Sequence, residues 1–353
     1  MCLVFLKPVF KKREPVVLSK IRRLMLLAAT AMVLPVQAAD YLKRTVCVWD
    51  IVGRGGPIAQ AVEEFNLEAI KWGVEFDMLV NSSEKIVVEQ FRSKQCDAAF
   101  LSELRIRNFV KFTGSLYAVG AMPERKHLQL MYQLLASPQM ADKMRVGPFE
   151  IAGIAPAGEV YVFVRDKSIN SLDKAVGRKI AVLGDDVYQQ QMVELIGGTP
   201  ISVTEATAGS MFNNGAVDVM PAPAVAYNPL ELYKGLEPSG GIINYPLAQI
   251  SGQLIIWHER FPEGFGQKSR EFHFAQFDRV MKEVESATNT IDPKWWVEIP
   301  EEDKSNYEKL MDDVRIEAVK ADYWDGDMIK LQRRVRCKFD PTRAECAKPR
   351  DVL

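Results

Sequence analysis

Residues 177–223 show the fold class of this chain most clearly. Their sequence is GRKIAVLGDDVYQQQMVELIGGTPISVTEATAGSMFNNGAVDVMPAP. Lys179–Leu183 is a short apolar run closed by a glycine, which indicates a buried strand. Val187–Leu195 has helical spacing and ends at two glycines, a residue that readily adopts the left-handed conformation common at helix ends. The pattern then predicts a strand over 200–204, a brief helix over 209–214 and a strand over 216–220. This alternation is the repeating unit of a parallel sheet covered by helices.

A second unit of the same design lies nearer the N-terminus. The pattern predicts strands over 45–50, 74–80 and 97–101, and helices over Pro57–Lys71 and 83–92. Proline favours the first position of a helix because the N–H group that it lacks has no partner there. The two units together predict an α/β protein with two lobes, each of β-α-β-α-β design.

Two longer apolar segments join the predicted lobes. Residues 150–164 and 245–257 are rich in strand-forming side chains, so we expect them to cross between the lobes in opposite directions. A long helix over 267–287 is then expected to pack back on lobe one. The remaining segments are predicted as helices over 104–110, 127–137, 295–321 and 327–334, a loop with a short strand over 113–121, and a polar tail over 338–353.

The order of motifs in residues 177–223 resembles a known family. A strand, a helix, Gly-Gly-x-Pro at 197–200, a strand and Gly-x-Val-Asp at 215–218 resemble the second lobe of extracytoplasmic solute-binding proteins of TRAP transporters. More narrowly, residues 44–261 resemble a family of periplasmic solute receptors, some of which carry an aminoglycoside-resistance efflux name.

The resemblance implies a two-lobed periplasmic-binding-protein fold. Each lobe is then a mainly parallel sheet flanked by helices, and crossing strands and a long helix join the two. The expected boundaries are a signal peptide over 1–38, the first part of lobe one over 39–152, lobe two over 153–246, the return to lobe one over 247–336 and a C-terminal tail over 337–353.

The first 38 residues have the pattern of a cleaved signal peptide. A basic segment precedes the apolar run 24–36, and Val36-Gln37-Ala38 is a small-residue cleavage site. A membrane anchor is the alternative, but the run is shorter than the roughly 20 residues that span a bilayer. Without residues 1–38 the chain holds 38 basic and 45 acidic side chains. Such an acidic chain does not favour nucleic acid or an anionic membrane as a partner.

Four cysteines remain after the predicted cleavage: Cys47, Cys96, Cys337 and Cys346. An even number in an exported chain favours disulfides over a metal site. Three pairings are possible. Cys47 and Cys96 lie on strands that can be neighbours, and the other two would close a short loop, so we expect Cys47–Cys96 and Cys337–Cys346. Free buried thiols are the alternative.

The sequence offers little support for an enzyme. Its three histidines, His127, His258 and His273, are scattered and lack the spacing of metal ligands. No Gly-x-Ser-x-Gly nucleophile turn and no phosphate-binding Gly-x-x-x-x-Gly-Lys-Ser/Thr loop occurs. Residues 53–56 could hold an anion at a helix N-terminus, or form a plain tight turn. We expect no metal and no cofactor.

Candidate binding residues follow the predicted strands. Ligands of open α/β sheets lie beyond the carboxyl ends of the strands, where the loops converge. Each of these side chains can equally be a helix cap or a solvated loop residue. The candidates are Trp49, Asp50, Arg54, Ser102, Glu103, Asp185, Asp186, Tyr188, Glu205 and Ala222, with Glu159 added by the resemblance.

The chain departs from the TRAP pattern where those receptors hold a carboxylate. The resemblance places the family's arginine at Ala181, its asparagine at Ala222 and a second arginine at Glu159. An arginine fork gives bidentate recognition of a carboxylate. Its loss, with several acidic candidates, favours a neutral or amine-bearing ligand. Alternatively, the acidic residues lie at a rim and are satisfied by lysines and water.

The sequence therefore favours a periplasmic solute receptor rather than an enzyme. It would bind a small molecule between two lobes and deliver it to a membrane transporter or an efflux assembly. Two alternatives stay open: an accessory protein of an envelope or efflux complex that binds no small ligand, and an enzyme on the same bilobal scaffold.

Overall fold

The structure, a computed structural model, describes residues 41–184 and 186–350, apart from the side chain of Glu302. The predicted signal peptide and the predicted site residue Asp185 lie outside the described residues. The described strands are β1 (Leu42–Trp49), β2 (Val74–Asn81), β3 (Ala98–Ser102), β4 (Arg145–Val146), β5 (Phe149–Val164), β6 (Lys179–Leu183), β7 (Thr199–Val203), β8 (Val219–Pro223), β9 (Gly241–Trp257) and β10 (Trp296–Val297).

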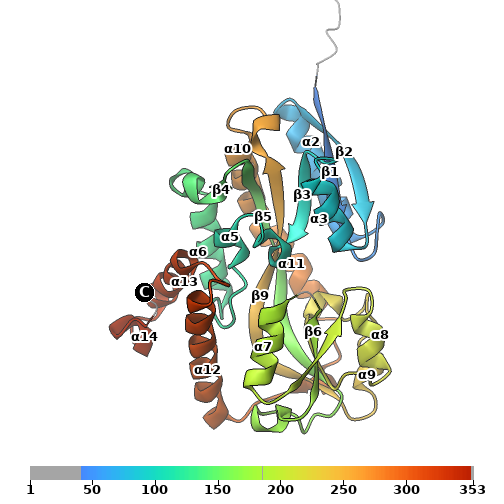
Figure 1. Ribbon diagram of the computed structural model, residues 1–353, viewed down its shortest axis with the longest axis vertical. Coiled ribbons are helices and arrows are strands. Elements are labelled where there is room, and N and C mark those ends of the chain that lie inside the picture. The colour runs from blue at the N-terminus through green and yellow to red at the C-terminus, as the bar shows by residue number, and fades with distance from the viewer. Residues whose placement is uncertain (1–40, 185, 351–353) are drawn as a thin grey trace, which may run out of the picture. The chain divides into compact units, whose positions relative to one another are not determined.

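Helices cover the strands on both sides (Figure 1). The α-helices are α2 (Pro57–Lys71), α3 (Glu84–Arg92), α4 (Glu103–Ile106), α5 (Lys111–Gly114), α6 (Arg125–Ala136), α7 (Val187–Leu195), α8 (Ala208–Asn213), α9 (Tyr233–Leu236), α10 (Phe265–Ala275), α11 (Phe277–Thr288), α12 (Glu301–Lys320), α13 (Gly326–Phe339) and α14 (Ala344–Ala347). The 3-10 helices are η1 (Pro138–Met144), η2 (Asp173–Ala175), η3 (Ala224–Ala226), η4 (His258–Arg260) and η5 (Pro293–Trp295).

Lobe one is built on the parallel strands β1, β2 and β3. β1 lies between the other two and pairs in parallel with both. The buried residues of α2, among them Val62, Phe65 and Ala69, recur three or four positions apart and form one apolar face. Phe65 packs against Phe76 of β2 and Phe265 of α10. This aromatic cluster holds α2 and α10 on the same face of the sheet.

Lobe two has the same design. β6 lies between β7 and β8 and is parallel to both. Helices α7, α8 and α9 accompany these strands (Figure 1). Phe163 of β5 and Phe212 of α8 are both fully buried, and they meet edge to face in the core of this lobe.

The long strands β5 and β9 run through both lobes (Figure 1). They pair antiparallel with each other from Phe149 opposite Trp257 to Val164 opposite Gly241. β9 also pairs with β3 of lobe one, and β5 pairs with β8 of lobe two. The strand order is therefore continuous, β2-β1-β3-β9-β5-β8-β6-β7, with β10 beside β9 and β4 beside β5. This confirms the predicted two-lobed α/β fold with two crossing strands.

Two predicted elements have different limits in the structure. The strand expected over 216–220 is β8, which starts at Val219 and continues through Pro221 and Pro223. β8 pairs with β6 only at Val219, and beyond it the pairing is with β5 alone. A strand accommodates proline in that situation, since no hydrogen-bond ladder continues on its other side.

The expected long helix over 267–287 is in fact two helices, α10 and α11, separated by Gln276. α10 packs against β5, where the ring of His273 lies so close to Gly153 that a Cβ atom on that glycine would be 2.5 Å from it. α11 buries Phe277, Met281 and Val284, which lie on a single face. α10 and α11 therefore pack against different parts of the core.

Three further predictions were wrong in part. The helix expected over 104–110 is the shorter α4. Residues 113–121 contain no strand, and the chain there begins with the end of α5. The helix expected over 295–321 begins only at Glu301, because Pro300 occupies its N-cap position. These segments have apolar residues that pack on distant parts of the chain, so local periodicity did not define their structure.

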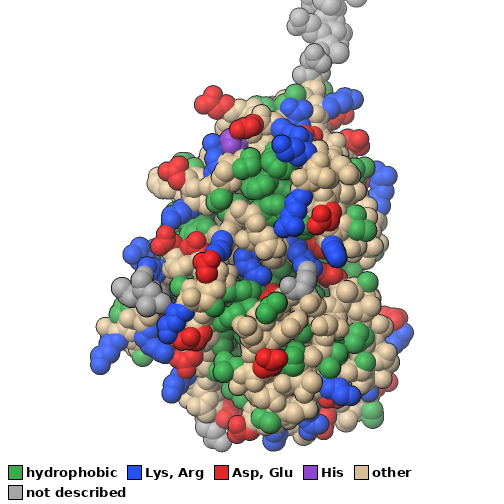
Figure 2. All heavy atoms as spheres, in the orientation of Figure 1, with side chains coloured by type: hydrophobic (Ala, Val, Ile, Leu, Met, Phe, Trp, Pro, Cys, Tyr) green, Lys and Arg blue, Asp and Glu red, His purple; other side chains and the backbone are tan. Residues whose placement is uncertain are grey.

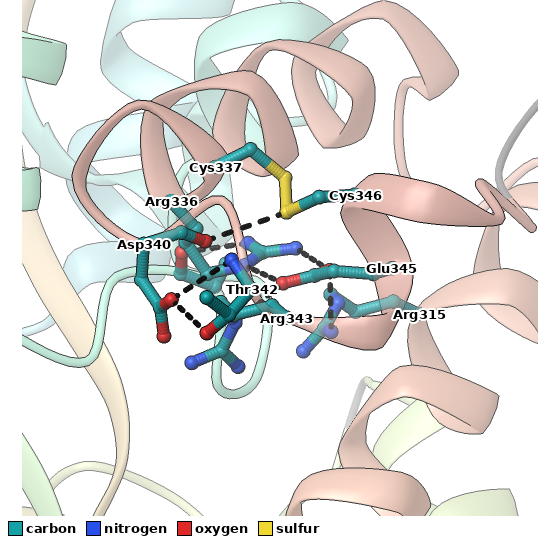
Figure 3. Close-up of a disulfide and its surroundings, with 9 residues drawn as sticks. Arg315, Arg336, Cys337, Asp340, Thr342, Arg343, Glu345 and Cys346 are labelled. Carbon is teal, nitrogen blue, oxygen red and sulfur yellow. Dashed lines mark hydrogen bonds and ion pairs between the residues drawn. A yellow bond between two sulfur atoms is a disulfide. The ribbon is translucent and has the colours of Figure 1, made fainter.

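Both predicted disulfides are present, Cys47–Cys96 in lobe one and Cys337–Cys346 near the C-terminus. The second disulfide closes a turn that leads into α14 (Figure 3). The sequence predicted a polar tail at this place and no helix. Glu345 of α14 accepts hydrogen bonds from Nε of Arg336 at 2.7 Å and Nε of Arg343 at 2.9 Å. Burial opposes ionisation of Glu345, but these arginines outweigh it and lower its pKa to about 2.

The surface carries charges of both signs. On the face drawn in Figure 2, acidic and basic side chains are interspersed. Among residues 41–184 and 186–350, no helix has both the length and the apolar character needed to cross a membrane.

Candidate functional site

Several predicted site residues meet where the two lobes meet. Arg105 follows the carboxyl end of β3 in lobe one, and Glu205 follows the carboxyl end of β7 in lobe two. Nη2 of Arg105 donates to Oε1 of Glu205 at 2.8 Å, although the residues lie 100 positions apart in the chain. We call this region the lobe junction. Parallel strands of both lobes therefore direct their carboxyl ends to one place, as the sheet rule predicts.

Asp186 is the centre of a second contact between the lobes. It caps α7, since its Oδ1 accepts the backbone N–H groups of Tyr188 and Gln189, both at 3.1 Å. Its Oδ2 accepts the hydroxyl of Tyr323 at 2.6 Å and lies 3.7 Å from Nη2 of Arg107. The predicted helix cap is thus also a contact with the C-terminal part of the chain.

Aromatic rings extend this contact. Tyr188 stacks on Tyr323 with ring centroids 4.2 Å apart, and its hydroxyl donates to the carbonyl oxygen of Val314 at 3.1 Å. The guanidinium of Arg107 lies 3.5 Å from the centroid of the Tyr323 ring. The Tyr323 hydroxyl is also 2.7 Å from that of Tyr117. We refer to Arg107, Tyr117, Asp186, Tyr188 and Tyr323 as the Asp186 network.

Glu103 is fully buried in lobe one beside the junction. Its Oε2 accepts two hydrogen bonds from Ser251 of β9, from the backbone N–H at 2.5 Å and from Oγ at 2.6 Å. Burial raises the pKa of Glu103 to about 8, although these bonds favour the ionised form. Burial and the charges of Asp186 and Glu103 raise the pKa of Tyr117, which lies near both carboxylates.

Glu84 adds a second buried carboxylate to this region. Its Oε1 accepts the backbone N–H of Ser102 at 2.6 Å, and its Oε2 lies 3.5 Å from Nε of Arg105. Burial raises the pKa of Glu84 to about 7. Arg105 therefore lies between a carboxylate of lobe one and Glu205 of lobe two.

β9 carries polar residues at alternate positions next to Glu103. Gln249, Ser251 and Gln253 point to one face of the strand, and each is buried. We call them the β9 polar stripe. Nε2 of Gln249 donates to Oε1 of Glu159 at 3.3 Å, and Nε2 of Gln253 lies 3.2 Å from Oγ of Ser251. The hydrogen bond from Gln249 places Glu159, a residue of the crossing strand β5, next to the β9 polar stripe.

Several of these polar atoms lack a hydrogen-bond partner. A buried polar atom without one is costly in a folded protein, and it marks a place where a bound molecule or water belongs. Among the described residues of this region, the atoms are Nε1 of Trp49, Oγ of Ser102, Oε1 of Glu103, Oη of Tyr132, Oε1 of Gln249 and Oε1 of Gln253. The Tyr132 hydroxyl belongs to this region because, besides burial, Glu103 and Ser251 affect its pKa.

The other predicted residues lie apart from this cluster or serve the fold. Asp50 accepts the backbone N–H groups of Val52, Ile58 and Ala59, so it caps α2 and occupies the position where residues 53–56 could have held an anion. Arg54 is exposed in the turn before α2.

The two alanines that the resemblance places at the family's polar positions are buried. Ala181 of β6 is 7% exposed and Ala222 of β8 is 5% exposed, and they belong to the apolar core of lobe two. Neither side chain can bind a carboxylate.

Sequence reasoning missed several residues of the junction: Glu84, Arg105, Arg107, Tyr117, Gln249, Ser251, Gln253 and Tyr323. One signal was present, because the polar residues of QISGQ recur at every second position in an otherwise apolar strand. The others reach the site through contacts between distant segments, which no local pattern reveals. Within the described part of the chain, no cluster of His, Cys, Asp or Glu could hold a metal ion.

Comparisons with known proteins agree on the fold. Two solved structures of TRAP periplasmic solute-binding proteins superpose with this chain. One, from Desulfovibrio salexigens with bound orotic acid, has a TM-score of 0.66 at 14% identity and covers 84% of this chain and 99% of its own. The other, from Sulfitobacter sp. NAS-14.1 with bound β-D-galacturonate, has a TM-score of 0.65 at 16% identity and covers 83% and 99%.

Sequence comparison gives a narrower result. The probable solute-binding protein AdeT1 of Acinetobacter baumannii is 42% identical over 300 residues, which are 85% of this chain and 99% of the relative. The family model described as solute-binding protein AdeT 1/2 matches residues 43–351. The chain therefore belongs to the AdeT 1/2 family of solute-binding proteins.

Proposed function

We propose that this protein is an extracytoplasmic solute receptor. It binds a small molecule at the lobe junction, closes its lobes around it and delivers it to a membrane transporter. The signal peptide over 1–38 directs it to the periplasm and is cleaved. The lobes divide at 152/153 and 246/247. The protein carries out no reaction on its ligand.

The contact between Arg105 and Glu205 is the observation that carries this proposal. It joins loops that follow the carboxyl ends of strands in two different lobes, at the place where α/β sheets bind ligands. The names of the relatives in the AdeT 1/2 family and the TRAP-type fold support the same function.

We propose further that the ligand is neutral or carries an amine. The TRAP structures described above hold orotic acid and β-D-galacturonate, which are carboxylates. Here the resemblance places Ala181, Ala222 and Glu159 where those receptors use arginine or asparagine. Both alanines are buried and apolar, which supports a different mode of recognition.

Thermal unfolding of residues 39–353 with matched solutes tests the proposal. One set is 1,4-diaminobutane, 1,4-butanediol and succinate, and the other is glucosamine, glucose and glucuronate. A solute at a hundredfold excess over its Kd stabilises the folded state by about 2.7 kcal/mol, a rise of several degrees. A rise with any member supports a receptor. A flat result across both sets, extended to a wider metabolite panel, would contradict it.

One observation favours a second candidate, an accessory protein without a small ligand. The junction is bridged by Arg105–Glu205 and by the Asp186 network, so the described form is already closed. If closure is permanent, the lobe-to-lobe distance in solution has a single value that no solute changes. The spin-label measurement described in the Discussion separates the two candidates.

A further inference from the structure

Of the two carboxyl oxygens of Glu103, one accepts hydrogen bonds and the other has no partner among the described residues. Oε2 accepts both donors of Ser251, whereas Oε1 has no hydrogen-bond partner among residues 41–184 and 186–350, although the residue is completely buried. An ionised carboxylate accepts hydrogen bonds at both oxygens. Oε1 therefore has the capacity to accept a donor from outside the described residues.

A second, independent group is left in the same condition. Gln253 is also completely buried, and its Nε2 donates to the carbonyl oxygen of Thr113 at 3.0 Å and to Oγ of Ser251 at 3.2 Å. Its Oε1 has no hydrogen-bond partner within the described part of the chain. Ser251 contacts both Glu103 and Gln253, so it connects two acceptor groups, each with one unpartnered oxygen.

Two more carboxyl groups lie near this pair. Glu84 lies close enough to Glu103 to raise its pKa, and Glu205 lies across the junction. Arg105 is a cation in this region, and it contacts Glu84 and Glu205 rather than Glu103. An ammonium group, which only donates hydrogen bonds, matches two acceptor oxygens and favours the ionised form of the nearby glutamates. A carboxylate, which only accepts, does neither.

We propose that Glu103 is the anchor for a primary ammonium group of the solute, with Oε1 of Gln253 as a second acceptor. This rests on the proposed receptor function and names the chemical class of its ligand. Ser251 positions both side chains, and parting of the lobes gives the solute access to them. The site is thus specific for an amine, where the TRAP receptors described above hold carboxylates.

The ionisation of Glu103 gives the proposal a signature that does not depend on substitution. Burial raises its pKa to about 8, and the groups facing it are Glu84 of α3, Tyr117, Tyr132 of α6 and Ser251 of β9. A bound ammonium favours the carboxylate. Amine binding near pH 7 therefore releases a proton, up to one per site, and the release vanishes above about pH 9.

The test is titration calorimetry of residues 39–353 with the two matched solute sets, in phosphate and in HEPES buffer, neither of which is a primary amine. The variants are Glu103→Gln, which keeps the shape, and Glu103→Asp, which keeps the charge. Glu89→Gln is the control, an exposed glutamate of α3 in the same lobe. Circular dichroism confirms that each variant is folded. If Glu103→Gln does not fold, proton release by the unsubstituted protein decides.

We expect 1,4-diaminobutane or glucosamine to bind with proton release. Glu103→Gln weakens this binding at least about tenfold and abolishes the release, because a buried charge pair is worth more than 1.4 kcal/mol. Glu103→Asp lies between, and Glu89→Gln changes neither quantity.

Other outcomes separate the two levels of the proposal. Amine binding that Glu103→Gln leaves unchanged, or binding only of diols, sugars or carboxylates, overturns the ammonium anchor and leaves the receptor intact. Binding of no solute of any class counts against both.

Discussion

Asp50 shows how one carboxylate fixes the start of a helix. It is 1% exposed and accepts N–H groups of Val52, Ile58 and Ala59 at 2.8 to 3.0 Å. The approach is so close that a Cβ atom on Gly56 would lie 2.1 Å from the carboxylate. The N-terminus of α2 is thus satisfied from within the chain, and the residue contributes to stability rather than to ligand binding.

Replacement of Asp50 by alanine should therefore destabilise the protein. Three backbone donors lose their acceptor, one of them buried, and the expected loss in free energy of unfolding is about 2 kcal/mol. Urea unfolding measures it. Ser83→Ala is the matched control, because Ser83 occupies the N-cap of α3 but makes no side-chain cap bond. Equal effects of the two substitutions would show that Asp50 is no cap.

Glu103 should make stability depend on pH. Its pKa in the folded protein, about 8, is above the unfolded value of 4.5, so its contribution is fully present below pH 4.5 and is lost as the pH rises through about 8. Unfolding of Glu103→Gln and of the unsubstituted protein is compared at pH 5 and pH 8.5. The variant should gain on the order of a few kcal/mol relative to the parent at the higher pH. An equal difference at both pH values contradicts the buried, raised-pKa carboxylate.

At the scale of elements, the C-terminal part of the chain joins the lobes. Tyr323 follows α12 and contacts Asp186 at the N-terminus of α7 in lobe two and Tyr117 in lobe one. The contact between the lobes therefore includes a segment that neither lobe's β-α-β unit contains.

Tyr323→Phe should open the junction. The substitution keeps the ring that stacks on Tyr188 and removes the hydroxyl bonded to Asp186. Spin labels at Lys85→Cys of α3 and Ser210→Cys of α8, both exposed, report the distance between the lobes. We expect a larger population at long distance in the variant. Tyr233→Phe is the control, since that hydroxyl contacts only Glu231 on the surface among the described residues. An unchanged distribution would mean that the hydroxyl does not hold the lobes together.

Glu345 should be essential to the C-terminal helices. Arg336 is 1% exposed and Arg315 is 4% exposed, and removal of the carboxylate leaves both with too little negative charge. Burial, with the charge of Arg336, already lowers the pKa of Arg315 to about 10. Glu345→Gln should cost about 3 kcal/mol by urea unfolding. Glu301→Gln, at an exposed ion pair with Lys304, should cost less than about 1 kcal/mol, and similar losses would contradict this role.

Much of the element order could be predicted from the sequence. β6, α7 and α2 have the predicted limits, because their periodicity, glycines and Pro57 act locally. The break between α10 and α11 could not, since it follows from packing against β5 and the core. At the junction, Glu103, Asp186 and Glu205 were predicted from their place after strands. Their partners Ser251, Tyr323 and Arg105 required the tertiary structure.

At the scale of the whole molecule, one sheet continues through both lobes along β5 and β9. Their pairing shifts register between Pro156 and Gly158, and Gly158 has a φ of 102°, a conformation that glycine tolerates best. These irregularities lie between the parts of the strands that pair with β3 and β8. A bend at this point would move lobe two against lobe one while the parallel strands of each lobe stay paired.

A small solute should close the lobes, and the spin-label pair at Lys85→Cys and Ser210→Cys reports this movement. In residues 39–353 all four native cysteines are held in disulfides, so only the introduced ones react. The distance distribution is measured without solute and with the matched solute that raises the unfolding temperature most. We expect both short and long distances between the two labels without solute, and a single short distance with it. The same distribution in both samples would contradict it.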